Sequence, residues 1–162
     1  MYKSQGIPLP SADSFATPLG NIPVDWKVLS KAIPLPQVKI NDAAFEGEHS
    51  LEVHLPFLQH ALDKFSLVPL LVGDATPEHV DQVLQKVWGG PETLIVISTD
   101  LSHFHDYDTA IKKDAEATRA IETFNLGGLN GGLACGFRPP SGLLRVDYTL
   151  ALPPTALDSR TP

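Results

Sequence analysis

Residues 94–106, LIVISTDLSHFHD, join an apolar run directly to a cluster of polar side chains. The run Leu94, Ile95, Val96 and Ile97 is typical of a strand that is buried on both faces in the centre of an α/β sheet. Ligands and catalytic groups usually lie at the carboxyl ends of such strands, so the sequence predicts a functional site in the polar residues that follow. The alternative is a solvated loop whose acids cap and turn the chain.

The preceding residues predict a strand–helix–strand unit. Residues 66–73, SLVPLLVG, have the composition of a strand that ends at a glycine. Thr76-Pro77-Glu78 is a strong helix start, and apolar side chains recur on one face of the helix, at Val80, Val83, Leu84 and Val87. With residues 93–98 as the second strand, the order is that of a βαβ crossover, so we expect two parallel neighbouring strands.

Three further helices are expected. One runs from Asp25 to Lys31, and a second begins near residues 48–50 and continues to Phe65. Pro56 either lies in the first turn of a later helix start or kinks this second helix. The third covers residues 108–124, and its expected apolar face consists of Ala110, Ile111, Ala115, Thr118 and Ile121.

The remaining segments predict little regular structure. Six prolines in the first forty residues favour a segment that wraps a surface, and the glycine-rich residues 126–136 predict a loop or a broken helix. Nothing divides the chain, so residues 1–162 are expected to form a single domain. Two strands are too few to complete an α/β sheet, so the edges of this sheet are expected to pair with further chain or with a second copy.

Composition excludes several classes of protein. The formal net charge is −7 and no cluster of Lys and Arg occurs, so no nucleic-acid surface is expected. No apolar run approaches the roughly 20 residues of a membrane-spanning helix. The chain has one cysteine, Cys135, and therefore no internal disulfide. Together these features predict a cytoplasmic protein.

Several side chains are candidates for chemistry. Asp100 and His103 follow the predicted strand at a spacing that lets the carboxylate orient the imidazole, as a general acid/base requires. His49 and Glu52 are three residues apart and could share a metal ion, although acids at a helix start also fit ordinary capping. Cys135 lies between glycines, where a thiol is accessible to a metal; a lone cysteine is more often a small buried apolar residue.

These motifs together resemble one family. LPSADSFATPLGNIPVD, EHSLEVHLPFLQ, LVPLLVGD, LIVISTDLSHFHDY and ACG occur in this order, as in the Memo-like proteins, also called AmmeMemoRadiSam system protein B. That family is similar in fold to the class III extradiol ring-opening dioxygenases. The resemblance implies an αβα sandwich around a central, partly parallel sheet, incomplete in this chain, with a metal site in a cleft.

The resemblance also implies roles for single residues. Cys135 matches a metal ligand of the family, Asp100 and His103 match the pair beside the metal, and His49 matches a motif near the cleft. The implied metal is Fe(II) or Cu. The family's PHAGY and GPSHH-like motifs, which carry two further ligands, are absent from the sequence, so we expect weak metal binding or none. The chain is expected to lack the N-terminal and C-terminal parts of the family domain.

Three functions remain open at this point. The first is a nonheme-metal redox enzyme in which His103 is the acid/base. The second is a non-catalytic module that binds a peptide or a small molecule and acts with a protein partner. The third is an inactive shortened form. Open sheet edges also predict self-association.

Overall fold

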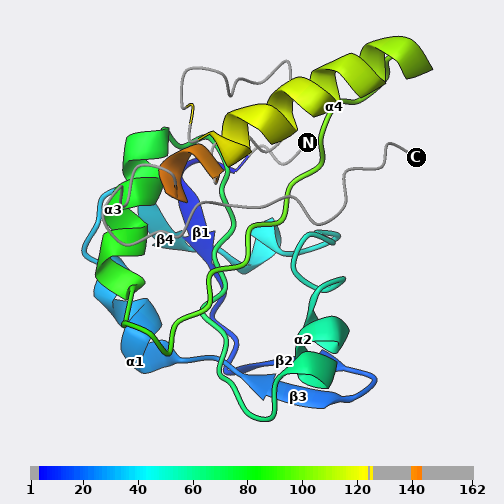
Figure 1. Cartoon of the computed structure of the whole chain (residues 1–162). Coiled ribbons are helices and arrows are strands. Elements are labelled where there is room, and N and C mark those ends of the chain that lie inside the picture. The colour runs from blue at the N-terminus through cyan, green and yellow to red at the C-terminus, as the bar shows by residue number, and fades with distance from the viewer. Residues whose placement is uncertain (1–3, 124, 126–139, 144–162) are drawn as a thin grey trace. The chain divides into compact units, whose positions relative to one another are not determined.

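The computed structural model describes residues 4–123, 125 and 140–143. These residues form a mixed α/β structure, which confirms the predicted fold class; its likeness to the dioxygenases stays a prediction. Figure 1 shows their helices and strands. The described residues fall into two compact units. The first unit comprises residues 4–75 and 85–94, and the second comprises residues 76–84 and the described residues from 95 onward.

All strands of the described residues lie in the proline-rich first forty residues. β1 (Ile7–Leu9) pairs in parallel with β4 (Val38–Ile40), and β2 (Ser14–Thr17) forms an antiparallel hairpin with β3 (Gly20–Pro23). The prediction that this segment lacks regular structure is therefore wrong. A proline fits a strand wherever its missing N–H is not needed by the ladder, and Pro8 in β1 occupies such a position.

Residues 66–73 run beside β1 without forming a full strand. The N–H of Leu71 donates to the carbonyl of Pro8 (3.4 Å), and the N–H of Gly73 donates to the carbonyl of Gly6 (3.0 Å). No ladder forms between this segment and β1, because Pro8 has no N–H to return the hydrogen bond to Leu71. Isolated bridges occur only near the ends of the segment, between Val24 and Leu67 and between Gln5 and Asp74. The predicted strand at residues 66–73 therefore does not form, and its hydrogen bonds to β1 run in the antiparallel sense, with Leu71 opposite Pro8 and Gly73 opposite Gly6.

The predicted strand at residues 93–98 does not form. Leu94 is 65% exposed and Val96 is 46% exposed, so the run is not buried on both faces. A strand is defined by hydrogen bonds to a neighbour, and an apolar, β-branched composition supplies none by itself. Because neither of its two strands is formed, the predicted crossover is wrong.

Of the two shorter helices, α1 begins at its predicted cap and α2 begins beside Pro56. α1 (Trp26–Leu29) follows Asp25, whose carboxylate accepts a hydrogen bond from the N–H of Val28 (3.0 Å), and a 3₁₀ turn (Ser30–Ala32) continues it. A second 3₁₀ turn covers Asp42–Ala44. α2 (Leu55–Ala61) has Pro56 in its first turn, which confirms the later of the two predicted starts. Residues 51–54 form turns instead of the predicted first helical residues.

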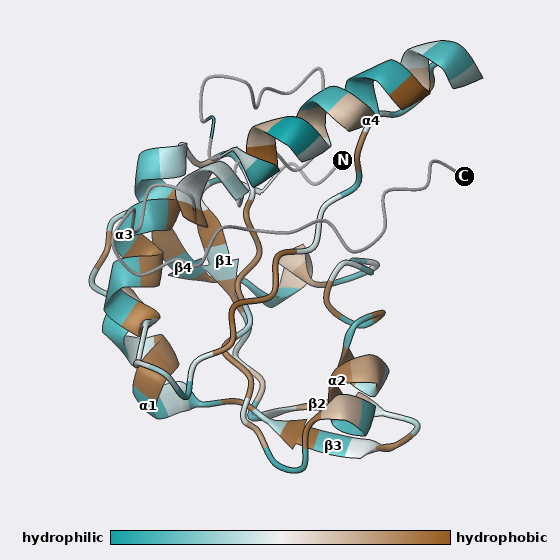
Figure 2. Ribbon diagram, viewed as in Figure 1, coloured by the Kyte–Doolittle hydropathy of each residue, from teal (hydrophilic) through white to brown (hydrophobic). Residues whose placement is uncertain are grey.

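α3 (Pro77–Val87) is the predicted amphipathic helix. The N–H of His79 donates to the hydroxyl of Thr76 (3.3 Å), so threonine caps the helix and proline occupies its first position. The predicted apolar face is buried, at Val80, Val83, Leu84 and Val87. Figure 2 shows apolar residues on one side of this helix and polar residues on the other.

α4 (Tyr107–Glu122) has a different buried face from the predicted one. Its buried residues are Asp114, Ala117 and Ala120, whereas Ile111 and Ala115 are exposed. No helix among the described residues has both the length and the apolar character needed to cross a membrane.

Candidate functional site

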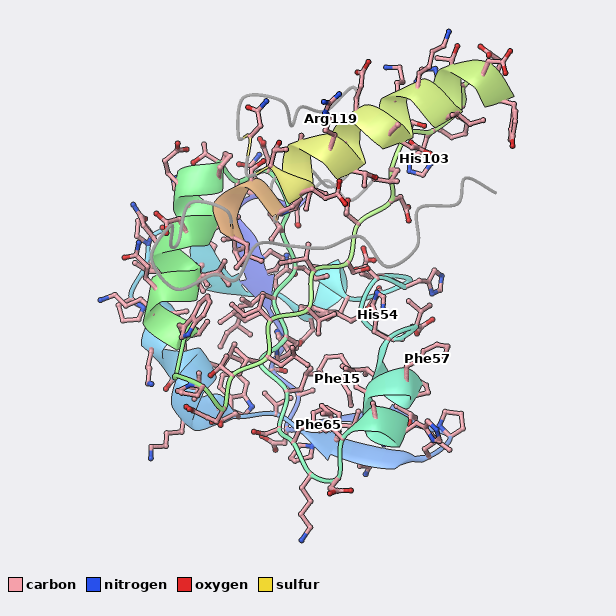
Figure 3. The ribbon with its side chains drawn as sticks, viewed as in Figure 1. Phe15, His54, Phe57, Phe65, His103 and Arg119 are labelled. Carbon is pink, nitrogen blue, oxygen red and sulfur yellow. The ribbon has the colours of Figure 1, made fainter. Side chains whose placement is uncertain are left out.

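The candidate acid/base pair lies in the second unit, just before α4. The side chain of His103 approaches Asp100, with 3.4 Å between Nε2 and Oδ2. This is ion-pair distance and slightly long for a hydrogen bond, so the carboxylate can attract and orient a protonated imidazole. The His103 side chain is 42% exposed, and Figure 3 shows it beside α4. His103 is thus accessible to a ligand.

The loop that carries His103, residues 102–106, is fixed at both ends. At its start, the N–H of Ser102 donates to Oδ1 of Asp114 (3.0 Å). At its end, the carboxylate of Asp106 accepts hydrogen bonds from the N–H (3.0 Å) and the hydroxyl (2.7 Å) of Thr109. We call residues 102–106 the His103 loop. Its two anchors limit the positions that the imidazole can take.

The cap at Asp106 gives the His103 loop a defined response to acid. The hydrogen bond from the Thr109 hydroxyl, followed by that from the Thr109 N–H, holds the pKa of Asp106 below its ordinary value of 3.8, against a smaller opposing effect of burial. The folded form therefore holds this proton more weakly than the unfolded form. The resulting stabilisation is present above the unfolded pKa and is lost as the pH falls through the lower, folded pKa.

We therefore expect acid to loosen the first turn of α4. Amide hydrogen exchange at Ala110, whose N–H donates to the carbonyl of Asp106 (2.9 Å), should accelerate, beyond the intrinsic effect of pH, as the pH falls from about 5 to below 3.8. Asp106→Asn keeps a capping oxygen without a titrating group, so this acid response should shrink. An unchanged response in Asp106→Asn would assign it to another acid, such as Asp108.

His49 lies in the first unit and makes a second short contact. Its Nδ1 is 2.6 Å from Oε1 of Glu52, and both side chains are largely exposed. The two side chains thus meet, although residues 51–54 form turns there instead of a helix, and their sharing of a metal ion stays a prediction. Burial raises the pKa of Glu48, but hydrogen bonds from Ser50 and His49 outweigh this effect and lower it overall.

Comparison with known proteins identifies the family. The sequence model of the family described as Memo-like protein matches residues 2–134, which is most of the chain. This chain belongs to the Memo-like family. The match includes His49, Asp100 and His103 and ends just before Cys135.

Curated relatives agree with this membership. A MEMO1 family protein of Metallosphaera sedula is 30% identical over 151 residues, covering 85% of this chain and 53% of the relative. One of Thermotoga maritima is 33% identical over 145 residues, covering 82% of this chain and 52% of the relative. One of Saccharolobus solfataricus is 33% identical over 122 residues, covering 70% of this chain and 43% of the relative. The Memo-like chain thus spans about half the length of these relatives.

The described residues of this Memo-like chain do not complete a metal site. Nonheme metal sites generally take three or more protein ligands, and no group of three His, Cys, Asp or Glu in the described part of the chain could hold one ion. Each histidine pair offers two donors, and the two pairs lie in separate units. Cys135, the predicted ligand, lies outside the described residues. No catalytic step through a metal follows from this donor set.

One residue of the site was missed by the sequence reasoning. Asp114 holds the His103 loop, yet the predicted apolar face of α4 left it on the polar side. A signal was present in the sequence. Ala110, Asp114, Ala117 and Ile121 recur at helical spacing, which places one acid within an otherwise apolar stripe. A carboxylate in such a stripe requires a donor, and here the donor is a loop N–H.

Proposed function

We propose that this chain carries the acid–base part of a Memo-like site, in which His103 exchanges a proton with a bound ligand and Asp100 orients the imidazole. The observation that carries the proposal is the pair itself: the two side chains approach to 3.4 Å, and His103 lies on a loop that is anchored at both ends. Asp100 faces Nε2, which leaves Nδ1 of His103 available for a ligand. A positioned histidine is the commonest general acid/base in enzymes.

We further propose that Cys135 and Fe(II) or Cu belong to the same site in the family domain, with His49 near its cleft. Membership of the Memo-like family supports this part of the proposal. The metal would supply Lewis-acid or redox chemistry when bound. The described residues support only the proton transfer at His103, through the contact between His103 and Asp100. The same residues contain no set of three ligands for the metal.

The purified chain is expected to bind Fe(II), Cu or Zn weakly and in less than one equivalent. Equilibrium dialysis followed by elemental analysis measures this content. Cys135→Ser should lower it further, because it removes the soft ligand, whereas His103→Ala and Asp100→Asn should leave it unchanged. One tightly bound equivalent in the wild type would contradict this expectation and imply a site that includes His49 or His103. Loss of metal in His103→Ala would make His103 a ligand.

The role of His103 is tested by turnover. Where the chain shows oxygen uptake with an aromatic diol and added Fe(II), His103→Ala should lower the rate by about 10²-fold or more at unchanged metal content. Asp100→Asn should cause a smaller loss, because it removes the orienting charge and leaves the imidazole. His105→Ala is the matched control, since that histidine is exposed in the same loop and makes no contact with Asp100 in the described pairs.

The non-catalytic alternative has one observation in its favour. Phe104, whose ring lies beside that of His103, is fully exposed, and Tyr107 and Ile111 are exposed in the first turns of α4. Exposed aromatic side chains of this kind are typical of surfaces that bind peptides or small molecules. If the chain shows no turnover in any of these assays and His103→Ala is neutral, binding at this surface becomes the better account.

A further inference from the structure

We infer that Asp114 is a positioning residue that holds the His103 loop in its present conformation. The inference deepens the proposed function. It rests on that proposal only for the role of His103 as acid/base. Asp114 lies in the middle of α4 and is only 8% exposed. Its Oδ1 accepts a hydrogen bond from the N–H of Ser102 at 3.0 Å, which joins residues that are twelve apart in sequence.

Burial makes this contact more than a surface interaction. A carboxylate removed from water is costly unless it accepts hydrogen bonds, and hydrogen bonds to a charged acceptor are among the stronger ones in proteins. The Ser102 hydroxyl is buried and has no hydrogen-bond partner among the described residues. The backbone N–H of Ser102, not its side chain, therefore fixes the start of the loop to α4.

The backbone inside the loop shows what this anchor restrains. Phe104 adopts a left-handed conformation, with φ of 58°, and its ring lies 5.7 Å from the ring of His103 between centroids. A bulky residue rarely adopts this conformation, which is unfavourable and persists only where the surrounding structure imposes it. The anchors at Ser102 and Asp106 lie on either side of Phe104. Loss of the first anchor would let this residue relax and would move His103 away from Asp100.

Amide hydrogen exchange measured by NMR on the full, metal-free chain tests the inference. In Asp114→Ala, the Ser102 amide should exchange about tenfold faster or more, because its acceptor is gone. Asp114→Asn keeps an uncharged acceptor oxygen and should restore part of the protection. The amide of Ala110, in the first turn of α4, should be unchanged. Asp108→Asn removes an exposed acid from the same helix and should have no effect on Ser102.

A second readout separates positioning from a general loss of stability. The ring resonances of His103 should shift toward those of a mobile, exposed histidine in Asp114→Ala and return most of the way in Asp114→Asn. Those of His79, in α3, should not move. Unchanged Ser102 exchange, or equal shifts at His79 and His103, would overturn the inference.

The wild-type chain provides a test even if Asp114→Ala fails to fold. The Ser102 amide should be protected, and it should lose protection together with the amides of α4 as urea is added. Exchange as fast as that of the exposed residues 103–105 would contradict the inference. No metal or substrate enters these measurements, so failure of the proposed function and failure of this inference give distinguishable results.

Discussion

Leu9→Ala is expected to lower the free energy of unfolding of the first unit by about 2–5 kcal/mol, because it truncates a fully buried side chain in β1 and leaves a cavity. Urea unfolding followed by tryptophan fluorescence measures the loss. Both tryptophans, Trp26 and Trp88, belong to the first unit, so the signal reports on this unit.

The matched control for Leu9→Ala lies directly across the sheet. Ile40 is the register partner of Leu9 in β4, but it is 52% exposed. Ile40→Ala removes a similar apolar volume from the same parallel pair and should cost about 1 kcal/mol or less. Equal losses for the two substitutions would mean that β1 is not the buried strand of this sheet.

Gly6→Ala is expected to lower the free energy of unfolding by about 3 kcal/mol, for two separate reasons. Gly6 has φ of +71°, a conformation that alanine rarely adopts. A Cβ built on it would also collide with the carbonyl oxygen of Gln37, at 2.2 Å. That same carbonyl accepts the hydrogen bond from the N–H of Ile7 (2.7 Å) that begins the pairing of β1 with β4.

Gly47→Ala separates the two causes. Gly47 has almost the same φ, +67°, but a Cβ there would have open space around it. Its substitution should therefore cost only the conformational part, about 1–2 kcal/mol. The same fluorescence-detected unfolding measures both variants. A Gly6→Ala loss no larger than that of Gly47→Ala would argue against the close approach of Gly6 to β4.

Local signals were sufficient to place the starts of α1 and α3. The carboxylate at Asp25 and the Thr76-Pro77 pair fix where α1 and α3 begin, because a cap acts on N–H groups a few residues away. The same holds for the partnership of His49 with Glu52, whose side chains meet at a spacing of three residues. Interactions of this range are readable in the sequence because the chain itself brings the partners together.

Strand pairing could not be read in the same way. The sequence predicted a strand at residues 93–98 from apolar composition, and it predicted irregular structure where β1 and β4 lie. Prolines argue against strands on average, yet Pro8 is tolerated because its carbonyl accepts a hydrogen bond and no donor is required of it. Which N–H groups a strand must supply depends on its neighbours, which are distant in sequence.

The sequence by itself determined the family and the starts of α1 and α3, and it pointed to Asp100 and His103 as a candidate pair. Only the tertiary structure decided that a parallel pair forms between residues 31 apart, and that a carboxylate in α4 anchors the His103 loop. The physical reason is common to both. A buried donor or acceptor must be matched by a partner, and long-range packing selects that partner from many that the sequence would allow.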